Sequence, residues 1–170
     1  MGLLNMIRIN LEKLKESHKT DLLNYNLLEG QDKFTAIPSI VFERISKREN
    51  IGDFTAIPVT IIYDNIPVGL FVLDFGNDRF VFTENKNSIL LKALSINPKY
   101  QGKGIAKKAM ELIPNFINEG IGFSDIEEIV LAVNIKNKNA YRLYRKVGYF
   151  ETGQAIIGNF GLQRIMKCEI

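Results

Sequence analysis

The stretch LSINPKYQGKGIAKK, residues 94–108, decides the fold, because a short apolar run ends in it and an amphipathic helix begins. Gly102 and Gly104 separate the two parts. Glycine lacks Cβ, so the chain can turn tightly there and a ligand can come close to the backbone. The first N–H groups of the helix have no partner within it and lie at the positive end of its dipole. The stretch therefore predicts a binding site for an anion such as phosphate.

Basic side chains gather at this stretch and at one other. Residues 99–108 contain four lysines and no acid, and residues 136–146 contain five basic residues and no acid, in a chain of net charge +3. An isolated run of charge is most often a solvated helix face. Two such runs, one of them on a predicted phosphate loop, favour an anionic ligand with several phosphates. The net charge itself is too small to indicate a nucleic-acid partner.

Length and composition are typical of one globular domain. A chain of 170 residues can bury one sizeable core, so residues 1–170 are expected to form a single domain. Apolar residues make up 46% and charged residues 24%, which argues against disorder. No run reaches the ~20 apolar residues that a membrane span needs, and the N-terminus lacks a signal-peptide pattern. We therefore expect a cytoplasmic protein with no membrane partner.

Histidine and cysteine are too rare to predict a metal site. His18 and Cys168 are the single residues of their kinds. One cysteine cannot form an internal disulfide, which agrees with a reducing compartment. His18 is expected to lie exposed in a helix, and Cys168 is expected to be a small apolar residue of a strand.

Hydrophobic periodicity predicts alternating strands and helices. Ser17 is expected to cap the first helix, Asp64-Asn65 to turn a hairpin, and Pro114 to kink the third helix or end it early. This order predicts an α/β fold in which a mixed sheet carries helices on both faces. The expected strands cover residues 6–11, 59–63, 66–75, 89–96, 129–133, 150–157 and 163–169, and the expected helices cover residues 17–28, 39–48, 106–117 and 140–147.

A second motif follows the glycine loop, because residues 137–149 read NKNAYRLYRKVGY. The patterns QxxGxA at residues 101–106 and NxxAxxLYxKxGY at residues 137–149 occur in this order and at this separation. Together they resemble the GNAT superfamily of N-acetyltransferases, over residues 89–149. The resemblance implies the GNAT-like form of the predicted fold.

The resemblance implies an enzyme that transfers an acetyl group from acetyl-CoA to a primary amine. The amine would attack the thioester directly, without a covalent intermediate or a metal. The acceptor would be a small molecule or a peptide, and the sequence does not identify it. An acyl-CoA-binding regulator, or a family member without activity, is the alternative. A triphosphate-binding protein is disfavoured, because the loop lacks the GxxxxGK[ST] spacing.

The resemblance also implies roles for two segments before and within the loop. The strand end Leu94, Ser95 and Ile96 would guide the pantetheine arm, and the N–H of Leu94 or Ile96 would hold the thioester oxygen. Gln101 would brace the turn. The pyrophosphate would be held by backbone N–H groups of Gly102, Lys103, Gly104, Ile105, Ala106 and Lys107.

Two residues of the second motif receive roles by the same resemblance. Asn137 would lie near the pantetheine arm, although it is equally well placed to cap a helix. Tyr144 would protonate the departing thiolate, since a phenol of pKa near ~10 stays protonated at neutral pH. Its alternative is an aromatic residue on the buried face of the helix.

The proton acceptor is not identified. Ala132 stands where several members of the family carry a glutamate, and a methyl group cannot accept a proton. This favours an acceptor amine of low pKa, or a base that acts through water. Asp74, Glu84 and Glu127 are candidate bases by composition only, and each is more commonly a solvated surface acid.

The pentapeptide Phe-Thr-Ala-Ile-Pro occurs twice, at residues 34–38 and 54–58. Two copies of five residues are too few for a structural repeat, so we interpret them as coincidence. The alternative is that Phe34 and Phe54 flank the acceptor pocket.

Overall fold

The sheet contains seven strands and is mixed, as predicted. The computed structural model describes residues 8–170, so the first two residues of the predicted strand 6–11 lie outside the described residues. The strand order is β1-β2-β3-β4-β5-β7-β6, and only the β4–β5 pair is parallel. The strands are β1 (Ile9–Lys13), β2 (Ala56–Tyr63), β3 (Ile66–Asp74), β4 (Ser88–Ile96), β5 (Glu128–Asn134), β6 (Phe150–Gly158) and β7 (Gly161–Glu169).

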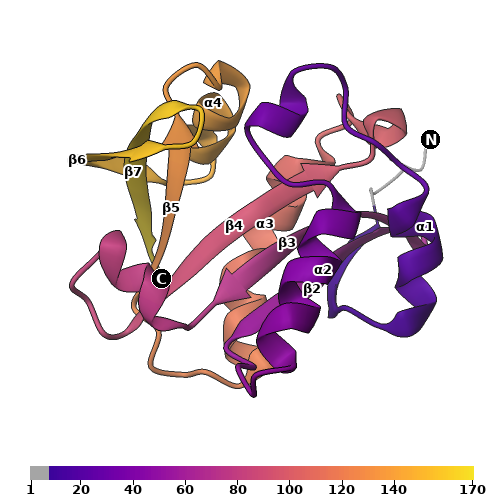
Figure 1. Ribbon diagram of the computed structural model, residues 1–170, viewed down its shortest axis with the longest axis horizontal. Helices are drawn as coiled ribbons and strands as arrows, with labels where there is room; N and C mark the ends of the chain where they lie inside the picture. Colours follow the sequence, from indigo (N-terminus) through magenta and orange to yellow (C-terminus); the bar gives the residue numbers. More distant parts are fainter. Residues whose placement is uncertain (1–7) are drawn as a thin grey trace, which may run out of the picture.

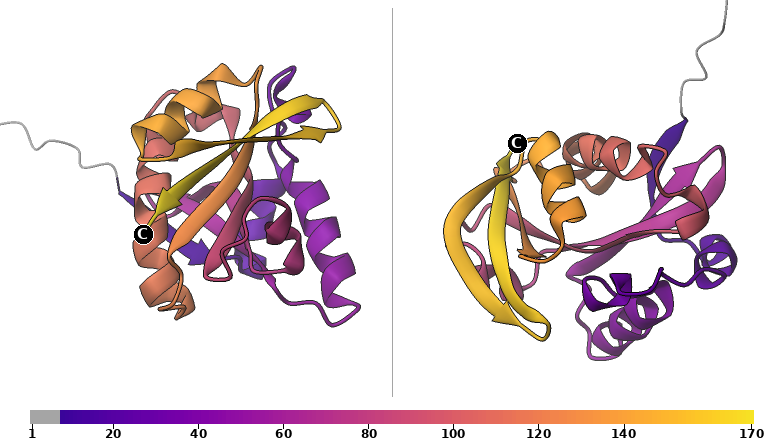
Figure 2. Two further views of the ribbon diagram at one scale, coloured as in Figure 1. Left: turned by 90° about the vertical axis from the view of Figure 1, so that its left-hand side faces the viewer. Right: turned by 90° about the horizontal axis from the view of Figure 1, so that it is seen from above.

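Helices cover both faces of the sheet, which confirms the predicted layers (Figure 2). The helices α1 (Lys19–Leu23) and α2 (Pro38–Glu49) pack on one face, against Leu70 and Val72 of β3. The helices α3 (Ile105–Asn115) and α4 (Lys138–Lys146) lie on the other face, where Phe71 and Leu73 point. Successive residues of a strand face opposite ways, so β3 contributes to both cores. The 3₁₀ segments are η1 (Glu16–His18), η2 (Gln31–Lys33), η3 (Asn77–Val81) and η4 (Pro98–Tyr100).

The predicted helix over residues 17–28 is wrong in its second part, because the helical segments end at Leu23. The chain forms η1 and then α1, which ends at Leu23, and Ser17 does not cap either segment. Asn24 and Asn26 are poor helix formers. Tyr25 is buried, and its hydroxyl lies 2.9 Å from that of Ser95 on β4. This tertiary contact draws residues 24–30 across the sheet instead of along a helix axis.

His18 is buried, with 7% of its surface exposed, and the prediction that it is exposed is wrong. Its Nδ1 atom lies 2.9 Å from the Thr60 hydroxyl on β2. Burial lowers the pKa of His18. The hydroxyl partner on a distant strand allows a polar ring to enter the core at low cost.

Pro114 marks the place where α3 changes its winding. Regular α-helix ends at Asn115, and the chain continues as a π-helix over η5 (Phe116–Ile121). Proline has no N–H and crowds the preceding turn, which agrees with the predicted early end. Ile113 and Ile117 still reach the same core on either side of the change.

The two central strands separate after a short parallel contact. Residues 88–90 of β4 pair with residues 128–130 of β5, and the strands then diverge, leaving the rest of β4 without a partner on that side (Figure 1). On the β3 side, the register shifts so that Ala93 and Leu94 together oppose Phe71. Ala93 takes a φ of 58°, a left-handed conformation that is uncommon for alanine. This bulge and the separated strands open the sheet beside the start of α3.

Candidate active site

A cavity of about 500 Å³ occupies the gap between β4 and β5, and it is large enough for a small-molecule site. On one side it is lined by Ala106 of α3 and by Leu143 and Tyr144 of α4, which pack on the α3/α4 core. On the other side it is lined by Leu27 and Ala93, which pack on the α1/α2 core. The cavity therefore passes through the sheet from one face to the other.

This cavity brings together many of the predicted site residues. Tyr144 and Asn137 line it, and the lining residues from the first motif are Leu94, Ser95, Ile96, Gln101 and Ala106. The remaining predicted residues of the cofactor site do not line the cavity. They lie in the adjacent turn and at the start of α3, and they are Gly102, Lys103, Gly104, Ile105 and Lys107. Ile105 points into the core, so only its backbone is available to a ligand.

The glycine loop has the geometry of an anion site. Gly102 and Gly104 have φ of 75° and 77°, and Gly104 precedes the first residue of α3. The N–H of Lys108 donates to Gly104 O at 3.1 Å, so the three preceding N–H groups of the helix have no helical acceptor. The side chains of Lys103 and Lys107 are exposed beside them. Free N–H groups and cations together favour a bound phosphate.

Gln101 braces this turn and ties it to a distant segment. Its Nε2 donates to Ile96 O at 2.9 Å, and its amide pairs with that of Gln31 through bonds of 3.1 and 3.2 Å. The Oε1 atom of Gln31 also accepts from Leu28 N at 3.1 Å. Sequence reasoning missed Gln31, because a single glutamine in a loop carries no local signal for a partner 70 residues away.

Tyr144 lines the cavity from the side of α4. It is partly buried on α4, and its ring lies 5.9 Å from that of Tyr149. Within residues 8–170 the hydroxyl has no hydrogen-bond partner. Burial raises the pKa of Tyr144 to about 12. The phenol is therefore neutral at physiological pH and has a proton to give.

Asn137 and Ser95 have partners inside the protein. The Asn137 side chain accepts from Ala140 N at 3.2 Å and so caps α4, which confirms the structural alternative for this residue. The Ser95 hydroxyl is engaged by Tyr25, whose own pKa burial raises to about 12. Tyr25 was not predicted as a neighbour of the site.

The candidate bases lie away from the cavity. Glu84 and Glu127 are exposed, whereas Asp74 is fully buried, which contradicts its interpretation as a surface acid. Burial alone would raise the pKa of Asp74, but hydrogen bonds from Arg48, Lys92 and the Gly76 N–H outweigh it and hold this pKa below its usual value. Ala132 lines the cavity, and within residues 8–170 no carboxylate does.

The sequence profile of the Acetyltransferase (GNAT) family matches residues 22–149. The chain belongs to this family. The Uncharacterized N-acetyltransferase YbbJ of Bacillus subtilis (strain 168) is 36% identical over 159 residues, which are 93% of this GNAT chain and 95% of that protein. Spermine/spermidine N(1)-acetyltransferase of the same organism is 22% identical over 95% of this chain and 99% of its own length.

Solved structures confirm the GNAT fold. Spermidine N-acetyltransferase from Vibrio cholerae, in complex with CoA and spermine, superposes with a TM-score of 0.66 at 20% identity, covering 95% of both chains. The aminoglycoside acetyltransferase AAC(6')-Ib, in complex with coenzyme A and kanamycin, gives a TM-score of 0.73 at 16% identity, again covering 95% of both chains. Together with the family match, these findings confirm the predicted class, an N-acetyltransferase that uses acetyl-CoA.

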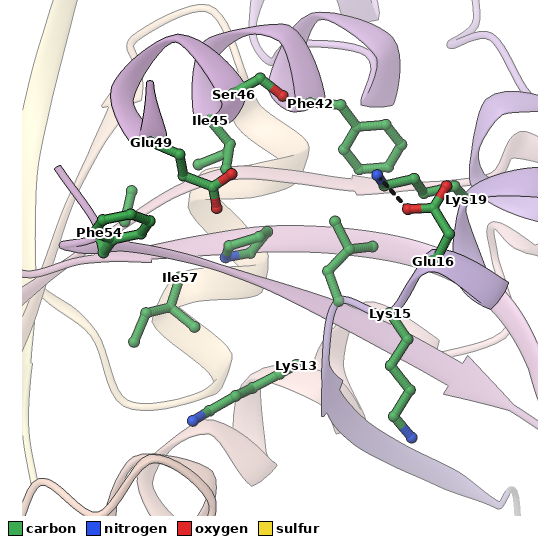
Figure 3. A pocket seen from close by; sticks show the side chains of 13 residues that line it. Lys13, Lys15, Glu16, Lys19, Phe42, Ile45, Ser46, Glu49, Phe54 and Ile57 are labelled. Atoms are coloured by element: carbon green, nitrogen blue, oxygen red, sulfur yellow. Dashed lines mark ion pairs between the residues drawn. The ribbon is translucent and has the colours of Figure 1, made fainter. Parts of the chain in front are cut away.

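A second cavity, of about 360 Å³, lies outside the GNAT site (Figure 3). It is formed between α2 and the strands β1 and β2, and Lys19 pairs with Glu16 at its edge, at 2.7 Å. Phe54 lines this cavity, whereas Phe34 lines the one between β4 and β5. The alternative in which both phenylalanines flank one acceptor pocket is therefore wrong.

Among residues 8–170, no three His, Cys, Asp or Glu side chains gather as metal ligands do. No helix in the described part of the chain is both long and apolar enough to cross a membrane.

Proposed function

We propose that this GNAT protein transfers the acetyl group of acetyl-CoA to a primary amine by direct attack inside the cavity between β4 and β5. One observation carries the proposal. The end of β4 at residues 94–96, Gln101 beside the glycine loop, and Tyr144 of α4 all line the same cavity. We propose further that residues 1–170 act as one catalytic domain in the cytoplasm. The acceptor is a small molecule or a peptide.

The cofactor enters from the side of α3. Free N–H groups of residues 102–107 hold the pyrophosphate, and each charge-assisted bond contributes roughly 1.5–3 kcal/mol. The pantetheine arm lies along Leu94, Ser95 and Ile96, on the edge of β4 that β5 leaves unpaired. The N–H of Leu94 or Ile96 stabilises the thioester oxygen as negative charge develops on it. Asn137, at the start of α4, lies beside the pantetheine arm on the opposite side of the cavity.

The acceptor arrives from the opposite face of the sheet. Its neutral nitrogen attacks the thioester carbon, a C–N bond forms, and the C–S bond breaks. The departing thiolate takes a proton from the Tyr144 hydroxyl, which is replenished from solvent. The nitrogen loses its proton to water, because the lining residues found within 8–170 include no carboxylate. An amine that is partly neutral at working pH suits such a site.

Replacing Tyr144 by Phe tests this chemistry. The variant keeps the ring and removes only the proton donor, so kcat should fall about 10²-fold or more while the KM for acetyl-CoA changes little. Tyr141→Phe is the matched control, because Tyr141 lies on the same helix but donates to Glu151 outside the cavity. Thiol release measures both variants. Full kcat in Tyr144→Phe would remove this residue from the mechanism.

The absence of a carboxylate from the lining residues favours one alternative, an acyl-CoA-binding regulator without turnover. Calorimetry with coenzyme A and thiol release with a panel of amines separate the two functions. Binding together with release supports the enzyme. Binding without release for every amine supports the regulator, and no binding at all contradicts both.

A further inference from the structure

The charge of the cavity between β4 and β5 restricts the acceptor, provided that the proposed function holds. Among the lining residues within 8–170, Lys92 is the only charged one. Its Nζ is hydrogen-bonded to the buried carboxylate of Asp74, which Arg48 also contacts. The Asp74 carboxylate is thus hydrogen-bonded to these two side chains and does not line the cavity. From the described part of the chain, a ligand in the cavity meets no negative side chain.

The wall on the acceptor side is neutral and largely apolar. Leu27, Phe34, Phe82 and Ala93 supply apolar surface. Thr35 supplies one polar atom, because its hydroxyl oxygen is buried and has no hydrogen-bond partner. This wall offers apolar contact and one hydrogen bond to the body of the acceptor.

The acidic residues that are nearest to this wall along the chain do not give the cavity a negative charge. Glu29 and Asp32 belong to the same loop segment as Thr35, but both are exposed and neither lines the cavity. An exposed carboxylate at the rim attracts a cation weakly, since solvent screens the charge.

A polycation is poorly matched to such a wall. Each ammonium group that leaves water without a carboxylate partner loses several kcal/mol of hydration. A single amine on an uncharged body avoids this loss, and it gains about 25 cal/mol for each Å² of apolar surface buried. An amine of low pKa also suits the cavity, because no lining carboxylate within residues 8–170 can accept the proton of a charged amine.

We infer that the acceptor is a single amine of low pKa on an uncharged, partly apolar body, such as an amino-acid amide or the N-terminus of an uncharged peptide. Such an acceptor differs from spermine, spermidine and kanamycin, the amines associated with spermine/spermidine N(1)-acetyltransferase and AAC(6')-Ib, because each of those molecules carries several amines. Polyamines and aminoglycosides are excluded as its preferred substrates.

Calorimetry on the CoA-loaded protein tests this inference independently of turnover. L-phenylalaninamide, a short uncharged peptide with a free N-terminus, spermidine and kanamycin are titrated separately at about pH 8, where α-amino groups are partly neutral. At least one of the first two should bind about tenfold or more tightly than either polycation. Comparison of the amide with the peptide distinguishes a small acceptor from a chain terminus.

A charge variant tests the same point by gain of function. Phe34→Glu places a carboxylate at the acceptor wall and should raise spermidine affinity about tenfold while weakening that of phenylalaninamide. Phe54→Glu is the matched control, because Phe54 stands in the same pentapeptide but lines the other cavity. It should leave both affinities unchanged.

The outcomes separate the inference from the proposed function. Preferred binding of either polycation, equal binding of all four amines, or binding of none overturns the inference. Preferred binding of the neutral-bodied amine without any thiol release supports the inference and contradicts the proposed enzyme. Preferred binding with release supports both.

Discussion

Gly104 has a backbone conformation that β-branched residues strongly disfavour. Its φ is 77°, and an added Cβ would meet no atom within 4 Å, so strain rather than a clash opposes a side chain there. Gly104→Val should turn the neighbouring N–H groups away from the pyrophosphate. We expect the KM for acetyl-CoA to rise about tenfold or more, as steady-state kinetics would measure.

Gly52→Val is the control for this change. Gly52 has a φ of 78°, has equally open surroundings, and lies in the turn after α2. Both variants should lose similar stability, but the control should keep the KM of the wild type. If the KM for acetyl-CoA rose equally in both variants, the rise would be due to general destabilisation and not to a change in the glycine loop.

The structural role of a single residue could be predicted where the residues next to it in the sequence form a recognisable pattern. The Asp64-Asn65 turn joins β2 and β3 as expected, since both residues adopt the positive φ that a tight hairpin needs. Tyr144 lines the cavity, and the catalytic role that its motif suggests stays a prediction. Gln31 and Tyr25 were missed, because each contacts the site through a partner 70 residues away. Such pairs arise only when the sheet forms.

At the scale of elements, the segment between α1 and α2 is joined to the glycine loop by the Gln31–Gln101 amide pair. Gln31→Leu removes both bonds, and with them the bond that Leu28 N donates to Gln31 Oε1. It should loosen residues 24–35, a segment from which Leu27, Gln31, Phe34 and Thr35 line the cavity. Because each neutral bond contributes about 1 kcal/mol, the acceptor KM should rise about fivefold to tenfold, with a smaller change for acetyl-CoA. Steady-state kinetics with both substrates varied measures the difference.

Gln154→Leu provides the comparison, since Gln154 is exposed on β6 and does not line the cavity. Its kinetics should match those of the wild type. If Gln31→Leu also left the acceptor KM unchanged, the segment would be held in place without the amide pair.

Element boundaries show why local sequence alone is insufficient. The pentapeptide Phe-Thr-Ala-Ile-Pro is a loop that leads into α2 at residues 34–38, with Pro38 at the first helical position, and it enters β2 at residues 54–58. Identical residues thus form different structures, and the neighbouring packing decides between them. The amphipathic helices α2, α3 and α4 and the apolar central strands were predicted correctly, because each has a hydrophobic pattern that repeats over several residues.

For the whole molecule, the buried carboxylate of Asp74 links α2, β3 and β4 through Arg48 and Lys92. Its pKa is lower folded than unfolded, so its stabilisation is present above about pH 4 and is lost as the pH falls through the folded value. Asp74→Asn should lower the free energy of unfolding by roughly 3 kcal/mol at pH 7. Urea unfolding should show this difference shrinking in acid, where the wild-type carboxyl also becomes neutral.

Asp53→Asn is the control for the network. Asp53 contacts the same Arg48 at 2.7 Å but lies near solvent, so its removal should cost less. A loss for Asp74→Asn that stayed constant between pH 7 and about pH 3 would contradict the role of its charge.

The short parallel contact between β4 and β5 also has a mechanical consequence. Only three residue pairs join the four strands β1–β4 to the three strands β5, β7 and β6, so the two parts of the sheet are hydrogen-bonded to each other at one end alone. An extended ligand with amide groups that binds between β4 and β5 would supply hydrogen bonds where the two strands do not pair. It would thereby connect the two parts of the sheet. The occupied protein should therefore resist heat better, by about 2.7 kcal/mol when the free ligand is at a hundred times its dissociation constant. Amide hydrogens along the open end of β5 should exchange more slowly in the same state.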